Sequence, residues 1–227
     1  MDCVDFAILA EDAYMDGNQA SIREVRRYGW RRVWQFSNAK TGFACSLYQH
    51  GSSGQFILAY RGSDDFGDLM TDLAIGVRWA TRQFQQAMNA HVTAKRKAGG
   101  GANLVGVCGH SLGGALAKFV AAKNGLLAYS FNGPGVSGMG GVDRANDQGD
   151  IRNINAVNDI VSKYGANLGR TKTVTVSSMN WVPDWMELGV SSLGGVLGVG
   201  NYLLSQHSIT NLRRKLQSMR PNRRPFA

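Results

Sequence analysis

Hydrophobic and polar positions in the first quarter of the chain predict one helix followed by β-structure. Apolar residues recur at helical spacing from Phe6 to Tyr14, which is typical of a short amphipathic helix. Three β-rich runs follow, over residues 31–36, 41–49 and 55–60. The last two are joined by the glycine-bearing loop 50–54, which predicts a β-hairpin.

Beyond residue 78 the pattern alternates between helical and strand-like segments. A long helix is predicted over 79–97, with Phe84, Met88 and Val92 on its apolar side. Further strands are predicted over 103–108, 126–131, 151–157 and 172–177, and further helices over 112–123 and 207–219. This alternation predicts an α/β fold, with a mainly parallel sheet, an N-terminal antiparallel hairpin and helices on both faces.

Length and composition fit a single globular domain over residues 1–227. The chain has 227 residues, 44% of them hydrophobic and 18% charged, enough to bury a core. No internal repeat or linker divides it, and the polar stretch 137–149 is too short to separate two domains.

The chain is strongly basic, which favours anionic partners. Its formal net charge is +9 and its isoelectric point is about 9.7. Arg213, Arg214, Lys215 and the tail 220–224 concentrate this charge near the C-terminus, where contact with anionic lipid head groups competes with ordinary solvation. No aromatic residues interleave with these charges, so a nucleic-acid partner is not expected.

Cysteine usage and the first residues bear on the compartment. Cys3, Cys45 and Cys108 cannot form a complete disulfide set, and Cys108 fits a small core residue. The N-terminus lacks the basic and apolar regions of an ordinary signal peptide. We therefore expect a protein that is cytoplasmic as synthesised, or that leaves the cell by a leaderless route.

The sequence Gly109-His110-Ser111-Leu112-Gly113 is the centre of the functional prediction. An apolar strand leads into it and an alanine-rich helix follows, which is the context of a nucleophile elbow. Such a turn lifts the serine hydroxyl above the sheet, and the helix N-terminus favours an anion there. The pentapeptide alone is a weak signal in a glycine-rich chain, so the prediction also depends on a histidine and a carboxylate elsewhere in the sequence.

A serine nucleophile needs a histidine to accept its proton and a carboxylate to orient that histidine. In the α/β order the histidine comes last, and of His50, His91, His110 and His207 only His207 follows Ser111 at a distance. His110 is expected to support the elbow from the other side.

The carboxylate is predicted from strand position. Five aspartates lie between the serine and His207: Asp143, Asp147, Asp150, Asp159 and Asp184. Asp159 follows the predicted strand 151–157 by two residues, at the sheet edge where sites are built. Asp184 is the alternative, and the first three are expected to be solvated.

An oxyanion hole needs two donors near the developing negative charge. The backbone N–H of Leu112 is the first candidate, and the turn at Gly62-Ser63 after an earlier strand is the second. The hydroxyl of Ser63 adds a further donor. No zinc-ligand spacing or phosphate-binding loop is present, so neither a metal nor another cofactor is expected.

Together these motifs resemble the class 3 lipases, the fungal-lipase-like branch of the α/β-hydrolase fold. The residues that carry the resemblance are Thr41-Gly42-Phe43, Phe56 to Ser63, Asp72, Gly109 to Ala117, Asn158 to Val161, and His207. The resemblance spans about residues 41–215.

The chain is similar in particular to bacterial members that act as phospholipases A, several of which are exported toxins without ordinary leaders. The resemblance implies that Ser63 supplies an oxyanion donor and that Asp72 is structural support. The chain departs from the family in its small size, so the lid between Asp65 and Val77 is expected to be short. The resemblance also brings an inhibitory or immunity protein into consideration as a partner.

These features predict a serine hydrolase, most specifically a phospholipase A1 acting on membrane glycerophospholipids through an acyl-enzyme. Triacylglycerol lipase or short-chain carboxylesterase activity is the alternative within the class. An inactive hydrolase that binds a membrane or a partner is the alternative of another class.

The acyl site is predicted beside the uncharged segment 188–206. Two interpretations stay open for this segment, a buried pocket wall or an exposed apolar flap that meets lipid. Its length approaches that of a membrane span, but its glycines and polar residues make it a poor one. The expected substrate-binding residues in and before this segment are Trp181, Trp185, Leu197 and Leu203.

Overall fold

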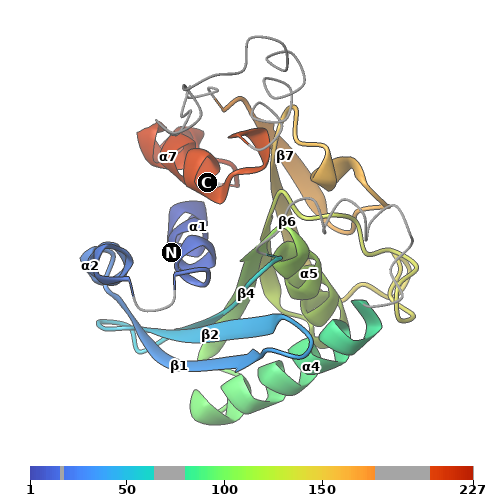
Figure 1. The fold of residues 1–227 in the computed structure, drawn as a ribbon, viewed down its shortest axis with the longest axis horizontal. Coiled ribbons are helices and arrows are strands. Elements are labelled where there is room, and N and C mark those ends of the chain that lie inside the picture. Colours follow the sequence, from blue (N-terminus) through green and yellow to red (C-terminus); the bar gives the residue numbers. More distant parts are fainter. Residues whose placement is uncertain (16–17, 64–79, 177–204, 227) are drawn as a thin grey trace, which may run out of the picture.

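A seven-stranded sheet forms the centre of the protein, and its strands lie side by side in the order of the chain (Figure 1). The computed structural model describes residues 1–15, 18–63, 80–176 and 205–226. The strands are β1 (Trp30–Asn38), β2 (Phe43–His50), β3 (Phe56–Tyr60), β4 (Leu104–His110), β5 (Leu127–Phe131), β6 (Asp150–Ala156) and β7 (Arg170–Val174).

The sheet changes from antiparallel to parallel at β3. Strands β1, β2 and β3 pair antiparallel, and β3 to β7 pair parallel, with Tyr60 opposite Gly109 in the β3–β4 register. The carboxyl ends of β3 to β6 therefore meet at one edge. This arrangement confirms the predicted α/β fold with an N-terminal antiparallel hairpin.

Helices cover both faces of the sheet (Figure 1). One face carries α1 (Cys3–Asp12), α2 (Gln19–Arg27) and α7 (Ile209–Ser218), and the other carries α4 (Ala80–Lys97) and α5 (Leu112–Asn124). Central strands alternate between two cores: Ile57 and Cys108 pack towards α1 and α7, whereas Leu58 and Val107 pack towards α4 and α5. Short 3-10 helices, η1 (Val161–Lys163) and η3 (Pro221–Arg223), complete the described elements.

Local sequence explains where the helices begin and which faces they bury. Asp2 and Asp5 form a reciprocal capping box at the start of α1, which satisfies two N-terminal backbone donors. Every residue of α5 from Leu112 to Ala122 is buried, because this helix lies between the sheet and α4. Gly125 ends α5 in a left-handed conformation (φ 65°).

One expectation about the helices was wrong, and one helix was not predicted. Val92 was expected on the apolar side with Phe84 and Met88 but is 60% exposed. An α-helix has 3.6 residues per turn, so residues spaced four apart move progressively around it and away from the buried face. Ala87, His91 and Ala94 face the core instead. Helix α2 was not predicted, since only Val25 of its nine residues is buried and six of the nine are polar or charged.

Within the described ranges, no helix is both long and apolar enough to cross a membrane.

Candidate active site

Ser111 stands in a sharp turn between β4 and α5, as the elbow motif predicts. Its backbone has φ 58° and ψ −129°, a conformation that L-residues rarely adopt. A Cβ at Gly109 would lie 2.3 Å from the Gly113 carbonyl, and a Cβ at Gly113 would lie 2.2 Å from the Tyr60 carbonyl oxygen. Glycine is therefore required on both sides of this serine for the helix to lie so close to β3 and β4.

The backbone of Ser111 is fixed on both sides of the turn. Its N–H donates to the carbonyl of Phe131 on β5 at 2.9 Å, and its carbonyl accepts from the N–H groups of Gly114 and Ala115. The side chain is 1% exposed, and its Oγ has no hydrogen-bond partner among the described residues. A buried hydroxyl at a strained turn is consistent with a functional site.

The predicted oxyanion residues lie at the same edge of the sheet. Leu112 is the first residue of α5, so its N–H belongs to the positive end of the helix dipole. The segment after β3 passes directly beside the elbow: a Cβ at Gly62 would lie 3.2 Å from the Ser111 Cβ and 2.6 Å from the His110 carbonyl oxygen. Ser63, which follows Gly62, is half-buried.

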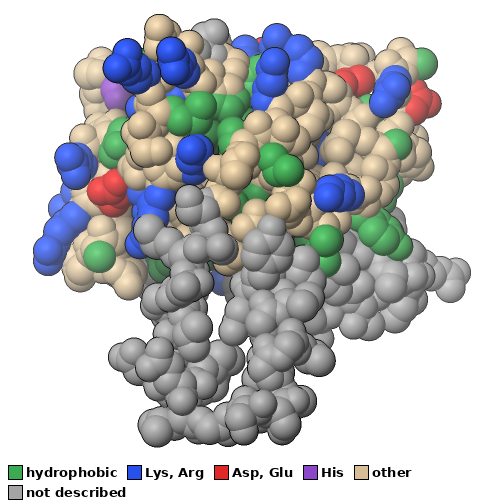
Figure 2. Space-filling view, turned by 90° about the horizontal axis from the view of Figure 1, so that it is seen from above, with side chains coloured by type: hydrophobic (Ala, Val, Ile, Leu, Met, Phe, Trp, Pro, Cys, Tyr) green, Lys and Arg blue, Asp and Glu red, His purple; other side chains and the backbone are tan. Residues whose placement is uncertain are grey.

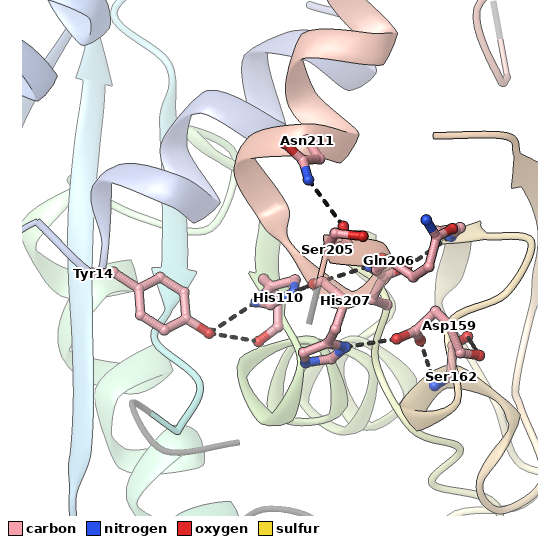
Figure 3. A network of polar contacts seen from close by, with 10 residues as sticks. Tyr14, His110, Asp159, Ser162, Ser205, Gln206, His207 and Asn211 are labelled. Atoms are coloured by element: carbon pink, nitrogen blue, oxygen red, sulfur yellow. Dashed lines mark hydrogen bonds and ion pairs between the residues drawn. The ribbon is translucent and has the colours of Figure 1, made fainter. Parts of the chain in front are cut away.

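His207 and Asp159 form a buried pair, although 48 residues separate them in sequence. The His207 Nδ1 lies 2.7 Å from Asp159 Oδ1, and the two residues are 7% and 0% exposed (Figure 3). Asp159 Oδ2 accepts the N–H of Ser162 at 2.7 Å, which fixes the carboxylate. Because Nδ1 donates to Asp159, the neutral ring of His207 keeps Nε2 as its basic nitrogen.

His110 supports the site from behind, as predicted. Its ring lies against that of His207, with centroids 4.6 Å apart, and its Nε2 is 2.5 Å from the His207 carbonyl oxygen (Figure 3). A carbonyl only accepts, so Nε2 must carry the proton and Nδ1 accepts from the Tyr14 hydroxyl at 3.0 Å. Burial, and then the neighbouring His207, hold the pKa of His110 well below its usual range, so the ring is neutral.

Tyr14 and Asn132 were missed by the sequence analysis. Tyr14 accepts the N–H of Gly62 at 3.1 Å and thereby joins the segment after β3 to His110. Asn132, fully buried after β5, donates from Nδ2 to the carbonyls of Gln206 (3.0 Å) and His207 (3.1 Å). Its place immediately after an apolar strand was the available signal, the same one that identified Asp159; nothing in the sequence marks Tyr14.

The structure thus brings Ser111, Leu112, Ser63, Asp159 and His207 to one edge of the sheet. Several other predicted residues lie outside the described ones: Trp181, Trp185, Leu197, Leu203, Asp72, the alternative carboxylate Asp184 and the lid Asp65 to Val77. Across the described ranges, no cluster of three or more His, Cys, Asp or Glu residues could hold a metal ion. All three cysteines are buried and free.

Comparison with known proteins supports the resemblance drawn from the sequence. A family model described as a Tle-like phospholipase domain matches residues 5–167. An extracellular phospholipase A1 of Serratia liquefaciens is 30% identical over 138 residues, which are 58% of this chain and 41% of that protein. The chain therefore spans about two fifths of the length of that relative.

Several solved structures that resemble the protein are lipases. Lipase II of Rhizopus niveus superposes with a TM-score of 0.58 at 17% identity, covering 75% of this chain and 78% of that one. A Rhizomucor miehei lipase in complex with its propeptide superposes with a TM-score of 0.59 at 15% identity, covering 92% of this chain and 77% of that one. At these identities the likeness establishes the fold.

Proposed function

Because the chain belongs to the Tle-like phospholipase domain family, we propose that it is a serine hydrolase that releases fatty acid from lipid esters, most specifically a phospholipase A1. The observation that carries this proposal is the buried His207–Asp159 pair, 2.7 Å apart, at the edge of the sheet where Ser111 occupies its strained turn.

In the proposed reaction, Ser111 Oγ attacks the ester carbonyl while His207 Nε2 accepts the hydroxyl proton. Asp159 holds the imidazole by its Nδ1–H and stabilises the imidazolium that forms. The negative charge of the tetrahedral intermediate develops where the Leu112 N–H and Ser63 act as donors. His207 then protonates the leaving alkoxide, so the lysolipid departs and the acyl group stays on Ser111.

Deacylation repeats these steps with water as the nucleophile. His207 takes a proton from water, hydroxide adds to the acyl carbonyl, and the proton returns to Ser111 Oγ as the fatty acid leaves. The neutral state of His110 matters here, because a second imidazolium against the ring of His207 would oppose its protonation.

A phospholipid substrate is favoured over a neutral one by the relative and by charge. The Serratia protein that matches this chain is named a phospholipase A1. The net charge of +9 attracts anionic membrane surfaces, and Lys and Arg side chains outnumber acidic ones on the face shown in Figure 2. In the basic tail, Arg220 and Arg223 are exposed, whereas Arg224 contacts Asp2. Contact with an anionic membrane is therefore part of the proposal.

Labelling with a fluorophosphonate probe tests the nucleophile. The wild-type protein should be modified at Ser111, as located by peptide mass spectrometry, and Ser111→Ala should lose both labelling and hydrolysis. His207→Ala and Asp159→Asn should each lower kcat/KM by about 10³-fold or more. Undiminished hydrolysis by Ser111→Ala would refute the mechanism.

A lipid panel tests the substrate. Phosphatidylglycerol, phosphatidylcholine, triolein and p-nitrophenyl butyrate are compared, and the released chain is identified by mass spectrometry with different acyl groups at sn-1 and sn-2. Release of the sn-1 chain from phospholipids is expected. Faster cleavage of triolein than of phospholipids would favour a triacylglycerol lipase. Cleavage of the butyrate ester alone would favour a short-chain esterase. A protein that neither cleaves any of these esters nor reacts with the probe would be an inactive binding module.

A further inference from the structure

A buried lysine lies two turns after Ser111 on the elbow helix. Lys118 is the only charged residue between Leu112 and Ala122, and it is 0% exposed. Placing an ammonium in a protein interior costs free energy that an apolar side chain of similar size would not. Burial accordingly lowers the pKa of Lys118 to about 7.

The amine of Lys118 contacts two segments, one that follows β5 and one that precedes β7. Its Nζ donates to the Gly133 carbonyl at 3.0 Å and to Asn167 Oδ1 at 2.7 Å. Among the described residues, no carboxylate forms an ion pair with it, so its contacts are these neutral acceptors. The partners of Lys118 thus lie in the segment that follows β5 and in the connection between β6 and β7.

We propose that Lys118 is a positioning residue, which fixes the loops holding Asp159 and His207 relative to the helix that begins at Ser111. This inference rests on the proposed function, because it concerns the geometry of the same three side chains. Lys118 itself need not touch the substrate.

The first connection leads to Asp159. Asn167, held by Lys118, donates from Nδ2 to the Ser162 carbonyl at 3.3 Å. Ser162 donates its N–H to Asp159 Oδ2 at 2.7 Å and its hydroxyl to the Asp159 carbonyl at 3.3 Å. The carboxylate is therefore held by a turn whose other end is fixed by the amine of Lys118.

The second connection leads to His207. Gly133, the other acceptor of Lys118, directly follows Asn132, whose side chain donates to the His207 carbonyl and accepts the Ala156 N–H at 2.8 Å. Asn132 has φ 50°, a left-handed conformation that is uncommon for residues other than glycine, although asparagine adopts it more readily than most. The hydrogen bond from Lys118 to the next carbonyl restrains this conformation.

Loss of these restraints should slow the chemical step. Proton transfer from Ser111 to His207 depends on alignment, and a misplacement of about 1 Å can cost on the order of a hundredfold in rate. Lys118→Met retains apolar volume but leaves the Gly133 carbonyl and Asn167 without their donor. Lys123→Met is the matched control, since Lys123 is an exposed lysine at the end of the same helix.

The experiment titrates active sites with a fluorophosphonate and measures kcat and KM for p-nitrophenyl butyrate per titrated site. For Lys118→Met we expect the full number of sites, an unchanged KM, and values of kcat and of the labelling rate constant lower by about tenfold to a hundredfold. Lys123→Met should equal the wild type in all of these. A merely structural role would instead reduce the number of titrated sites and leave the rate per site unchanged.

Asn167→Ala provides the second variant, because it removes the hydrogen bond between Lys118 and Asn167 while the lysine side chain stays in its buried position. It should also lower kcat per site, and adding it to Lys118→Met should cause little further loss, since Lys118→Met has already broken the connection through Asn167. Wild-type rates per site in Asn167→Ala, or in a folded Lys118→Met, would overturn the inference alone. Failure of the wild-type protein to label at Ser111 would instead overturn the proposed function.

Discussion

At the scale of single residues, strained backbone gathers around the proposed nucleophile. Ser111 (φ 58°) and Asn132 (φ 50°) both lie in the left-handed half of backbone space, and each such residue costs on the order of 1–3 kcal/mol. These conformations are held by neighbouring glycines, Gly109, Gly113 and Gly133, which pack closely against other backbone atoms. The proposed activity therefore depends on residues that contribute no chemistry.

Gly113→Ala tests this dependence. The new methyl group would lie 2.2 Å from the Tyr60 carbonyl oxygen, so α5 must move away from β3. We expect the free energy of unfolding to fall by about 3 kcal/mol, measured by urea denaturation. Gly51→Ala is the control, because its methyl group would make an ordinary contact of 3.5 Å. Equal stabilities of the two variants would contradict the packing argument.

Lys118 makes stability depend on pH in a defined direction. Its pKa is about 7 in the folded protein and about 10.4 in the unfolded chain, so between these values only the unfolded state carries the proton. The free energy of unfolding therefore rises as pH increases through this window, by about 2 kcal/mol between pH 7 and 9. Below pH 7 both states are protonated and the contribution is constant.

Denaturation of the wild type and of Lys118→Met at pH 6, 7, 8 and 9 measures this effect. The difference in stability between the two proteins should change in favour of the wild type from pH 7 upwards. A difference that is the same at all four pH values would show that the lysine does not lose its proton in the folded state.

At the scale of elements, α7 places His207. Ser208 caps this helix and directly follows His207, so the position of the imidazole depends on how α7 packs against α1. Ile209, Leu212 and Leu216 are buried in this contact. Two further side chains of α7, Thr210 and Arg213, both contact the carboxylate of Glu11 on α1.

Leu212→Ala should therefore affect both stability and activity. Leu212 is 0% exposed, and its truncation should lower the free energy of unfolding by about 3 kcal/mol. Because α7 also fixes His207, we expect labelling of Ser111 to slow at temperatures well below the unfolding transition. Arg223→Ala, at an exposed position of η3, serves as the control. A wild-type rate of labelling in a destabilised Leu212→Ala would show that the packing of α7 does not affect the reactivity of Ser111.

At the scale of the whole molecule, charge should govern encounter with lipid. With a net charge of +9, the protein should hydrolyse vesicles that contain phosphatidylglycerol faster than pure phosphatidylcholine vesicles at low ionic strength. Added salt should remove this advantage, because the screening length falls from about 10 Å at 0.1 M to about 3 Å at 1 M. Soluble p-nitrophenyl butyrate is the control, and its hydrolysis should respond little. An advantage that survives 1 M salt would refute an electrostatic origin.

The fold, the turn at Ser111 and the pairing of Asp159 with His207 could be predicted from the sequence, whereas the catalytic roles of these three residues stay predictions. Strand and helix periodicity identified the sheet, and position after a strand together with chain order identified Asp159 and His207. Of the supporting residues, Asn132 carries the same signal, because it directly follows the apolar strand predicted over 126–131. Tyr14, the last residue of a predicted helix, carries none. Their roles arise only when segments 75 to 96 residues apart are brought together.

Lys118 is the intermediate case. A single charge in an otherwise apolar helix is visible in the sequence, but its partners come from two loops that the sequence analysis left unassigned. Val92 shows the reverse error, since an apolar residue at plausible spacing is exposed. Periodicity predicts which face of an element is buried, and it cannot predict what a buried polar group will meet there.

Strand order that equals chain order has a consequence for biosynthesis. As the polypeptide leaves the ribosome, each parallel strand can join the edge left by its predecessor, so the serine and then the aspartate reach their places early. The imidazole follows Asp159 by 48 residues and directly precedes the cap of α7, so the proposed lipid-cleaving centre is assembled only once this helix docks. A nascent chain would thus be unable to carry out the proposed lipid cleavage until α7 has packed against α1.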